Sequence, residues 1–191
     1  MQMRLHGDPV PKGTFMAKAK TDKIETTVTH LEMTNPPIRP PKRSPLARLM
    51  LLRLEECPVH FYRYLYDAVG HDYHWVDRKR LSDEDLKAII EADSTEITVV
   101  YVDGAPAGFG EIDYSDPDQP RIAYFGVMKE FQGRGVGGFL LDTLVRSAWS
   151  RGITMLSVET CTLDHPNALA TYQKIGFVPT AQETRVIEPI R

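Results

Sequence analysis

The sequence predicts a single α/β (α+β) domain, with a mixed, mostly antiparallel central sheet flanked by helices. Short β-branched segments alternate with amphipathic helical segments, a tight-turn signal joins two strands near the middle of the chain, and no segment repeats. The length of 191 residues suits one domain with a tail or two small domains. A domain of roughly 150 residues buries close to 70% of its unfolded surface, so it needs neither metal nor disulfides to fold.

Composition is that of an ordinary globular protein, with 42% apolar and 26% charged residues. The net charge of −3 creates no overall field that would attract nucleic acid or an anionic membrane, and we expect neither as a partner. The two cysteines, Cys57 and Cys161, are no disulfide framework. No apolar run reaches signal-peptide or membrane-spanning length. These features predict a cytoplasmic protein.

The first 47 residues are expected to precede the domain. Residues 1–23 are a polar, lysine-containing leader with little expected structure. Residues 24–47 combine a weak strand with a proline-rich linker of polyproline character. The predicted domain therefore covers residues 48–191, and its first strand is expected over the apolar residues 48–54.

Two helices are predicted next. Pro58 suits a first helical position and Gly70 the residue just past a helix end. Ser82 begins the second helix, with Asp85 three residues later as its capping-box partner. Apolar residues at helical spacing mark the buried faces of the two helices: Phe61, Tyr62, Leu65, Tyr66 and Val69, then Leu86, Ile89 and Ile90.

Three strands follow, and then the periodicity changes. Residues 97–102 are β-branched and aromatic, and Asp103-Gly104 is a hairpin signal. Further strands are expected over residues 107–114 and 122–128. The remaining elements are predicted to be a long helix, a strand, a second helix and extended chain, at residues 136–150, 153–160, 166–175 and 177–187.

Residues 132–138 contain four glycines between a strand and a long helix. Glycines let the backbone approach an anion closely, and the helix N-terminus adds a partial positive charge. Each charge-assisted hydrogen bond to a phosphate contributes ~1.5–3 kcal/mol, so several amides hold a diphosphate without a lysine. The segment predicts a diphosphate site.

A dinucleotide cofactor is one alternative for this site. Gly133, Gly135 and Gly138 satisfy Gly-x-Gly-x-x-Gly, and Glu159 lies about 20 residues later, where a ribose-binding acid is expected. However, residues 129–132 separate the preceding strand from the first glycine, and too few elements follow Glu159 for a dinucleotide fold. A dinucleotide-dependent oxidoreductase is therefore the weaker interpretation.

Two motifs resemble those of the GNAT superfamily of N-acetyltransferases. Residues 132–137 match the diphosphate loop Gln/Arg-x-x-Gly-x-Gly/Ala. Residues 165–177 resemble the second motif, Asn-x-x-Ala-x-x-x-Tyr-x-x-x-Gly-Phe, with a small shift of the alanine. The resemblance covers roughly residues 48–187. Residues 73–78, Tyr-His-Trp-Val-Asp-Arg, are similar to a bacterial GNAT subgroup.

This resemblance implies a GNAT-like sheet and an N-acetyltransferase, which transfers acetyl from acetyl-CoA to a primary amine by direct attack in a ternary complex. No metal is implied. A backbone N–H near Val127 would stabilise the tetrahedral oxygen. The residues implied to bind the cosubstrate are Phe125, Val127, Gln132, Gly133, Arg134, Gly135, Val136, Gly137, Asn167 and Tyr172.

The resemblance also assigns Tyr172 to protonation of the departing thiolate, although a buried helical tyrosine is the structural alternative. Many GNAT members carry a glutamate where this chain has Arg121, so the base is not given by the motif. Glu111, in the middle of a strand, is the first candidate, Glu159 the second and His165 the third. Loss of the proton to solvent is a further alternative.

Aromatic residues interleaved with aspartates suit a cationic amine, and Tyr73, Trp75 and Asp77 are the predicted acceptor-binding residues. The expected acceptor is a small-molecule or peptide amine, and a homodimer is left open. Cys57-x-x-His60 and His71-x-x-His74 have metal-ligand spacings without a second pair, so no metal site is predicted. Because the strand glutamate is missing, a CoA-binding regulatory module without catalysis is the alternative function.

Overall fold

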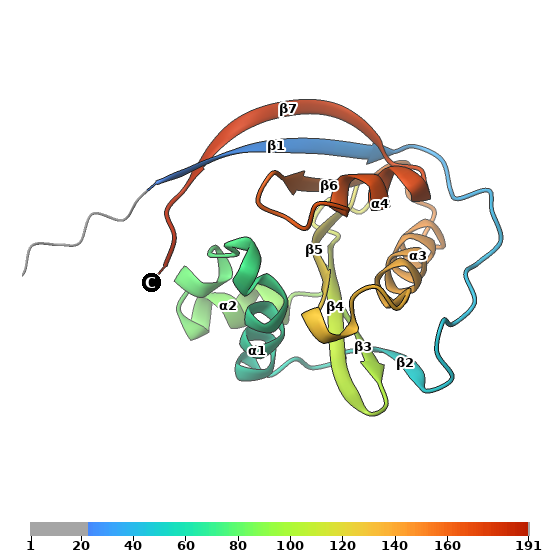
Figure 1. The fold of residues 1–191 in the computed structure, drawn as a ribbon, viewed down its shortest axis with the longest axis horizontal. Helices are drawn as coiled ribbons and strands as arrows, with labels where there is room; N and C mark the ends of the chain where they lie inside the picture. The colour runs from blue at the N-terminus through green and yellow to red at the C-terminus, as the bar shows by residue number, and fades with distance from the viewer. Residues whose placement is uncertain (1–22, 191) are drawn as a thin grey trace, which may run out of the picture.

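Seven strands form one sheet, in the order β2-β3-β4-β5-β6-β1-β7 (Figure 1). The computed structural model describes residues 23–190. The strands are β1 (Ile24–Met33), β2 (Leu49–Arg53), β3 (Thr95–Val102), β4 (Ala105–Asp113), β5 (Arg121–Val127), β6 (Leu156–Cys161) and β7 (Val178–Ile187). All neighbouring strands are antiparallel except β5 and β6, which are parallel. The predicted mixed, mostly antiparallel sheet is confirmed.

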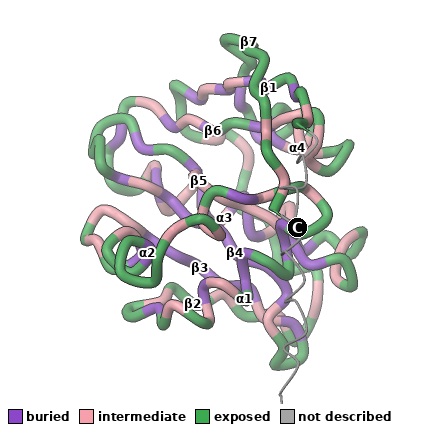
Figure 2. The backbone as a smooth tube through the Cα atoms, turned by 90° about the vertical axis from the view of Figure 1, so that its left-hand side faces the viewer, coloured by how far each residue is buried: buried purple, intermediate pink, exposed green. Residues whose placement is uncertain are grey.

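Helices cover both faces of the sheet. They are α1 (Val59–Gly70), α2 (Asp83–Ile90), α3 (Val136–Trp149) and α4 (Ala168–Ile175), with 3₁₀ turns η1 (His71–Tyr73), η2 (Arg78–Arg80) and η3 (Lys129–Phe131). In Figure 1, α1 and α2 lie on one side of β4 and β5, and α3 lies on the other. One buried cluster contains residues of α3 and α4, and a second contains residues of α1 and α2. Figure 2 shows the buried residues concentrated along the central strands.

The predicted helix signals lie within one residue of the observed helix ends. Helix α1 begins directly after Pro58 and ends at Gly70. At α2, the Ser82 hydroxyl accepts a hydrogen bond from the Asp85 amide (3.1 Å) and donates one to the Asp85 carboxylate (2.8 Å). The Ser82 hydroxyl therefore caps α2, whereas the Asp85 carboxylate bonds the Ser82 side chain and not the Ser82 backbone N–H that a full capping box uses.

Strand β1 lies inside the sheet, between β6 and β7, whereas we expected residues 24–47 to precede the domain. It pairs along its length with both neighbours, and Figure 1 shows β1 and β7 side by side. The sequence of β1 shows only a weak alternation of apolar and polar residues, because two of its buried residues are threonines. The Thr26 hydroxyl hydrogen-bonds Thr162 (2.8 Å), and Thr29 accepts from Gln182 (3.0 Å), so burial leaves these groups satisfied.

The proline-rich segment after β1 is docked against α3. The Lys42 amide donates to the Asp142 carboxylate (3.0 Å), and the Arg146 guanidinium donates to the carbonyl of Arg39 (2.6 Å). The segment therefore links β1 to β2 as a packed strap. The leader predicted for residues 1–23 lies outside the described residues, apart from Lys23.

Residues 178–187, expected as extended chain, form strand β7, although its side chains are nearly all exposed and show no apolar alternation. Its partner β1 supplies the hydrogen bonds that define it. None of the helices within residues 23–190 is long and apolar enough to cross a membrane.

Candidate active site

The glycine loop turns through left-handed backbone conformations. Gly133 has φ +73° and Gly135 has φ +81°, a region that favours glycine. Gly135 precedes α3, whose first amides, as at any helix start, lack intrahelical acceptors, and the N-cap residue, a glycine, has no side chain to cap them. A Cβ at Gly137 would lie 3.3 Å from the Val127 side chain, so the first turn of α3 packs closely on the end of β5. The loop thus presents free amides beside the end of a strand.

Gln132 ties this loop to two other elements. Its side-chain amide donates to the carbonyl of Val127 (3.0 Å) and to the Tyr73 hydroxyl (3.2 Å). The motif glutamine therefore joins the glycine loop to the end of β5 and to η1.

Strands β5 and β6 separate after a short contact. They pair only at Arg121 with Ser157 and at Ile122 with Val158. On the other side of β5 the register shifts, so that Ala123 has no partner on β4. Such a bulge bends a strand. The edge of β5 beyond Ile122 therefore faces open space instead of β6.

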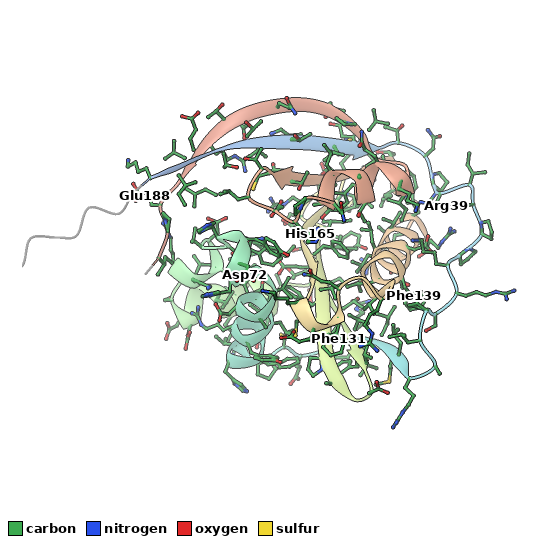
Figure 3. All side chains as sticks on the ribbon, in the orientation of Figure 1. Arg39, Asp72, Phe131, Phe139, His165 and Glu188 are labelled. Carbon is green, nitrogen blue, oxygen red and sulfur yellow. The ribbon has the colours of Figure 1, made fainter. Side chains whose placement is uncertain are left out.

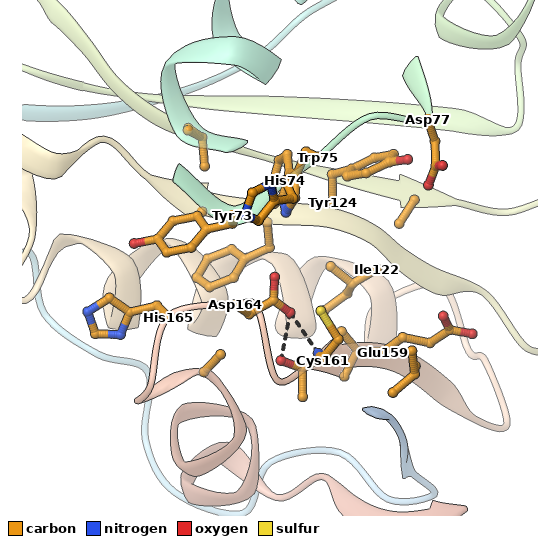
Figure 4. A pocket seen from close by; sticks show the side chains of 18 of the residues that line it. Tyr73, His74, Trp75, Asp77, Ile122, Tyr124, Glu159, Cys161, Asp164 and His165 are labelled. Carbon is orange, nitrogen blue, oxygen red and sulfur yellow. Dashed lines mark hydrogen bonds between the residues drawn. The ribbon is translucent and has the colours of Figure 1, made fainter. Parts of the chain in front are cut away.

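A cavity of about 760 Å³ occupies this opening. The glycine loop and α4 line one end. Residues 73–77, which follow α1, line the side wall that faces β6. Residues of β1 and β7 line the end away from the glycine loop. Figure 4 shows side chains from these elements converging on the cavity.

Tyr172 lies in α4, buried against two aromatic rings. The ring centroids of Phe125 and Phe177 lie 6.0 Å and 5.9 Å from its own, both edge-on. Tyr172 and Phe125 also line the cavity. Burial, and next the negative charge of Asp164, raise the pKa of Tyr172 above its ordinary value, so the phenol stays protonated at neutral pH.

Residues 55–177 match the profile of the Acetyltransferase (GNAT) family. This chain belongs to the GNAT family. The match includes both sequence motifs, the glycine loop and α4. No curated protein matches the sequence.

Solved structures show the same fold at low sequence identity. The ribosomal-protein-S18-alanine N-acetyltransferase from Escherichia coli has a TM-score of 0.57 and 18% identity, covering 70% of this chain and 79% of that one. An aminoglycoside acetyltransferase from an uncultured soil metagenomic sample, in complex with trehalose, has a TM-score of 0.57 and 17% identity, covering 68% and 88%. A functionally unknown conserved protein from Staphylococcus epidermidis has a TM-score of 0.58 and 19% identity, covering 88% of this chain. This GNAT chain spans 64% of the length of the Staphylococcus protein.

The structure brings the three predicted acceptor residues to the cavity of this GNAT domain. Trp75 packs against Tyr66 and Tyr124, with centroid distances of 5.2 Å and 5.1 Å. Tyr73 lines the end nearer the glycine loop, and Asp77 lines the end near Glu159 (Figure 4). The wall is therefore aromatic, with a carboxylate at one end.

Glu111, the first candidate for the base, does not line this cavity. It is fully buried between β4 and α1. Its carboxylate accepts hydrogen bonds from the Arg78 guanidinium (2.6 Å) and from the Tyr62 hydroxyl. The contacts of Glu111 are thus those of a buried ion pair beneath the aromatic wall, and not those of a solvated sheet face.

Glu159 does line the cavity, and it lies within β6, two residues before the strand ends. Arg185 donates to one carboxylate oxygen (2.7 Å), and His30 Nδ1 lies 3.2 Å from the other. Burial opposes ionisation, but the hydrogen bond and charge of Arg185 outweigh it and hold the pKa of Glu159 below its ordinary value. Its carboxylate is therefore already engaged on both oxygens.

Of the other residues predicted to bind the cosubstrate, some line the cavity and others do not. Val127 and the glycines at positions 133, 135 and 137 line the cavity. Val136 points its side chain into the core, and the Arg134 guanidinium lies over the Phe131 ring at 5.7 Å. Asn167 precedes α4 without a side-chain cap and is absent from the cavity wall, where His165 lies instead.

Sequence reasoning missed several cavity residues. Asp164 is among them, between β6 and α4. Lys23 and Glu188 come from opposite ends of the described chain and form an ion pair (3.1 Å), while Arg80 donates to the Glu188 carbonyl. Figure 3 shows Glu188 just beyond the end of β7, close to the start of β1. The pairing of β1 with β7 brings Lys23 and Glu188 together, and no local motif in the sequence indicates this pairing. Residues 23–190 contain no cluster of three potential metal ligands.

Proposed function

We propose that this GNAT protein transfers the acetyl group of acetyl-CoA to a primary amine by direct attack in a ternary complex. One observation carries the proposal: a single cavity joins the amides of the glycine loop, the Tyr172 phenol and an aromatic wall ending in Asp77. A diphosphate-bearing thioester and an amine would therefore meet beside a proton donor.

The cosubstrate would be held mainly by backbone groups. The N-terminal amides of α3, after the turn at Gly133 and Gly135, suit the linked phosphates. The edge of β5 beyond Ile122 has no strand partner on the β6 side, so it offers peptide groups to the amides of an extended chain. Phe125 and Val127 on this edge line the cavity.

The chemistry needs a proton acceptor, a stabilised oxyanion and a proton donor. An alkyl amine has a pKa near ~10.4, so less than about one in a thousand is the free base at neutral pH. A backbone N–H near Val127 would stabilise the developing oxyanion. Tyr172, which stays protonated, would donate its proton to the departing thiolate.

Tyr73, Trp75 and Asp77 would bind the acceptor. An aromatic face and a carboxylate both favour a cation, so they favour the protonated form in which an amine arrives. Two structural relatives are named for an aminoglycoside and for the alanine of a ribosomal protein. Both small amines and peptide amines are therefore candidate acceptors. We place the reaction in the cytoplasm, because both described cysteines are free thiols.

The test is release of CoA thiol from acetyl-CoA with a panel of small amines and peptides, with the product identified by mass spectrometry. We expect saturable release that depends on one class of amine, and tight binding of CoA by calorimetry. CoA binding without transfer to any amine would instead support a non-catalytic CoA-binding module. Preference for NADH over CoA would overturn the assignment of the loop.

A further inference from the structure

Asp164 occupies the middle of the cavity, in the turn between β6 and α4. It lines the same cavity as Tyr172 and Trp75. In Figure 4 its carboxylate lies between the wall that carries His74 and Trp75 and the strand end that carries Cys161. It therefore stands between the predicted acceptor wall and α4.

The two oxygens of this carboxylate have different surroundings. Oδ2 accepts hydrogen bonds from the Thr160 hydroxyl (2.8 Å) and from the Cys161 amide (2.9 Å). These bonds hold the side chain in one orientation, and Figure 4 shows the other oxygen directed into the cavity. A positioned carboxylate with one open oxygen is what a general base requires.

The other candidate carboxylates are less suited to accept a proton. Glu111 is buried outside the cavity and paired with Arg78. Glu159 is engaged by Arg185 and His30. Asp77 lies at the far end of the aromatic wall from Tyr73 (Figure 4). Among these carboxylates, Asp164 is the one whose negative charge adds to the effect of burial in raising the pKa of Tyr172.

We propose that Asp164 is the general base of this enzyme, a role that rests on the proposed acetyl transfer to an amine. Asp164 takes one proton from the ammonium, directly or through a water, and passes it to solvent. The neutral nitrogen then forms the C–N bond as the C–S bond breaks. The nitrogen loses its second proton to solvent, and Tyr172 protonates the thiolate and is reprotonated by solvent. The net products are an amide, CoA thiol and one proton.

The test compares Asp164→Asn with Thr160→Val. The asparagine retains a side-chain oxygen that can accept from Thr160 and Cys161, so it preserves the turn and removes only the charge. The valine breaks one of the bonds that orient the carboxylate and leaves the charge in place. Steady-state kinetics over a pH series and calorimetric CoA binding are measured for wild type and both variants.

We expect Asp164→Asn to lower kcat by about 10²- to 10⁴-fold, with CoA affinity unchanged. Thr160→Val should lower kcat much less. An Asp164→Asn variant that raises only the amine KM would overturn the assignment in favour of substrate binding. Equal losses of kcat in both variants would show that Asp164 stabilises the turn and accepts no proton.

The two proposals fail in distinguishable ways. If wild-type protein transfers acetyl and Asp164→Asn does so equally well, only the assignment of Asp164 is wrong. If the wild type transfers acetyl to no amine, the proposed function itself fails, and the role of Asp164 with it.

Discussion

Gln132 donates a hydrogen bond to the hydroxyl of Tyr73 (3.2 Å), which joins the glycine loop directly to the aromatic wall of the cavity. The same amide also holds the Val127 carbonyl (3.0 Å). One side chain therefore links the glycine loop to the end of β5 and to the part of the aromatic wall nearest the loop.

Replacement of Gln132 by Ala should impair binding of both substrates, because it removes both bonds. A hydrogen bond contributes about 0.5–1.5 kcal/mol, so each KM should rise roughly 2- to 12-fold for each bond lost. Tyr73→Phe is the matched control, since it removes only the bond to the wall and should raise the amine KM alone. A change in only the acetyl-CoA KM for both variants would contradict this link.

Tyr172→Phe should lower kcat by about 10²-fold while leaving CoA affinity unchanged. The phenylalanine ring keeps the contacts with Phe125 and Phe177, so only the proton donor is lost. Because the pKa of Tyr172 is raised, the wild-type rate should not fall through deprotonation of this group near pH 10. Stopped-flow measurement of thiol release checks both expectations, and an unchanged kcat would leave Tyr172 as a packing residue.

Glu111→Gln should destabilise the protein more than it alters the chemistry. Breaking a buried pair costs about 3–5 kcal/mol, because the guanidinium of Arg78 is left without its counter-charge. Urea unfolding should show this loss, and the double variant Glu111→Gln with Arg78→Met should recover part of it. A folded Glu111→Gln protein with kcat lowered 10²-fold or more would instead support a catalytic Glu111.

Gly133→Ala and Gly135→Ala form a matched pair in the glycine loop. Both positions require a left-handed backbone, which costs an L-residue about 1–2 kcal/mol. A Cβ at Gly133 meets open space, whereas one at Gly135 lies 3.0 Å from Pro45 in the strap that crosses α3. We expect Gly135→Ala to lose more thermal stability. Equal losses of thermal stability in the two variants would show that Pro45 moves away from the added methyl group without a measurable cost in free energy.

The pairing of Glu159 with Arg185 should stabilise the folded protein at neutral pH and stabilise it less in acid. The folded-state pKa of Glu159 is lowered, so the folded protein binds fewer protons than the unfolded chain as the pH falls. The stabilisation is complete at neutral pH and is lost as pH drops through the lowered pKa. Because Glu159 is 44% exposed, the term should be below about 1 kcal/mol. Urea unfolding of wild type and Glu159→Gln from pH 7 to pH 3 should show the two stabilities converging in acid.

Local chemistry in the sequence was sufficient for much of the architecture. The capping pair Ser82 and Asp85 and the turn at Asp103-Gly104 depend on neighbours within a few residues, so the helix and hairpin were predictable. The glycine loop and α4 were predictable for the same reason. The two motifs at residues 132–137 and 165–177 therefore indicated the GNAT family without any long-range contact.

Tertiary structure alone decided which distant residues share the cavity. Strand β1 takes its place between β6 and β7 through backbone pairing, to which its weak side-chain pattern gave no clue. Glu111 does not line the cavity because α1 and η2 cover its face of the sheet. Asp164 lines the cavity because β5 and β6 separate after two residue pairs. A sequence reports the preferences of neighbouring residues. Burial and strand pairing between residues more than a hundred positions apart depend on the free energy of the whole fold.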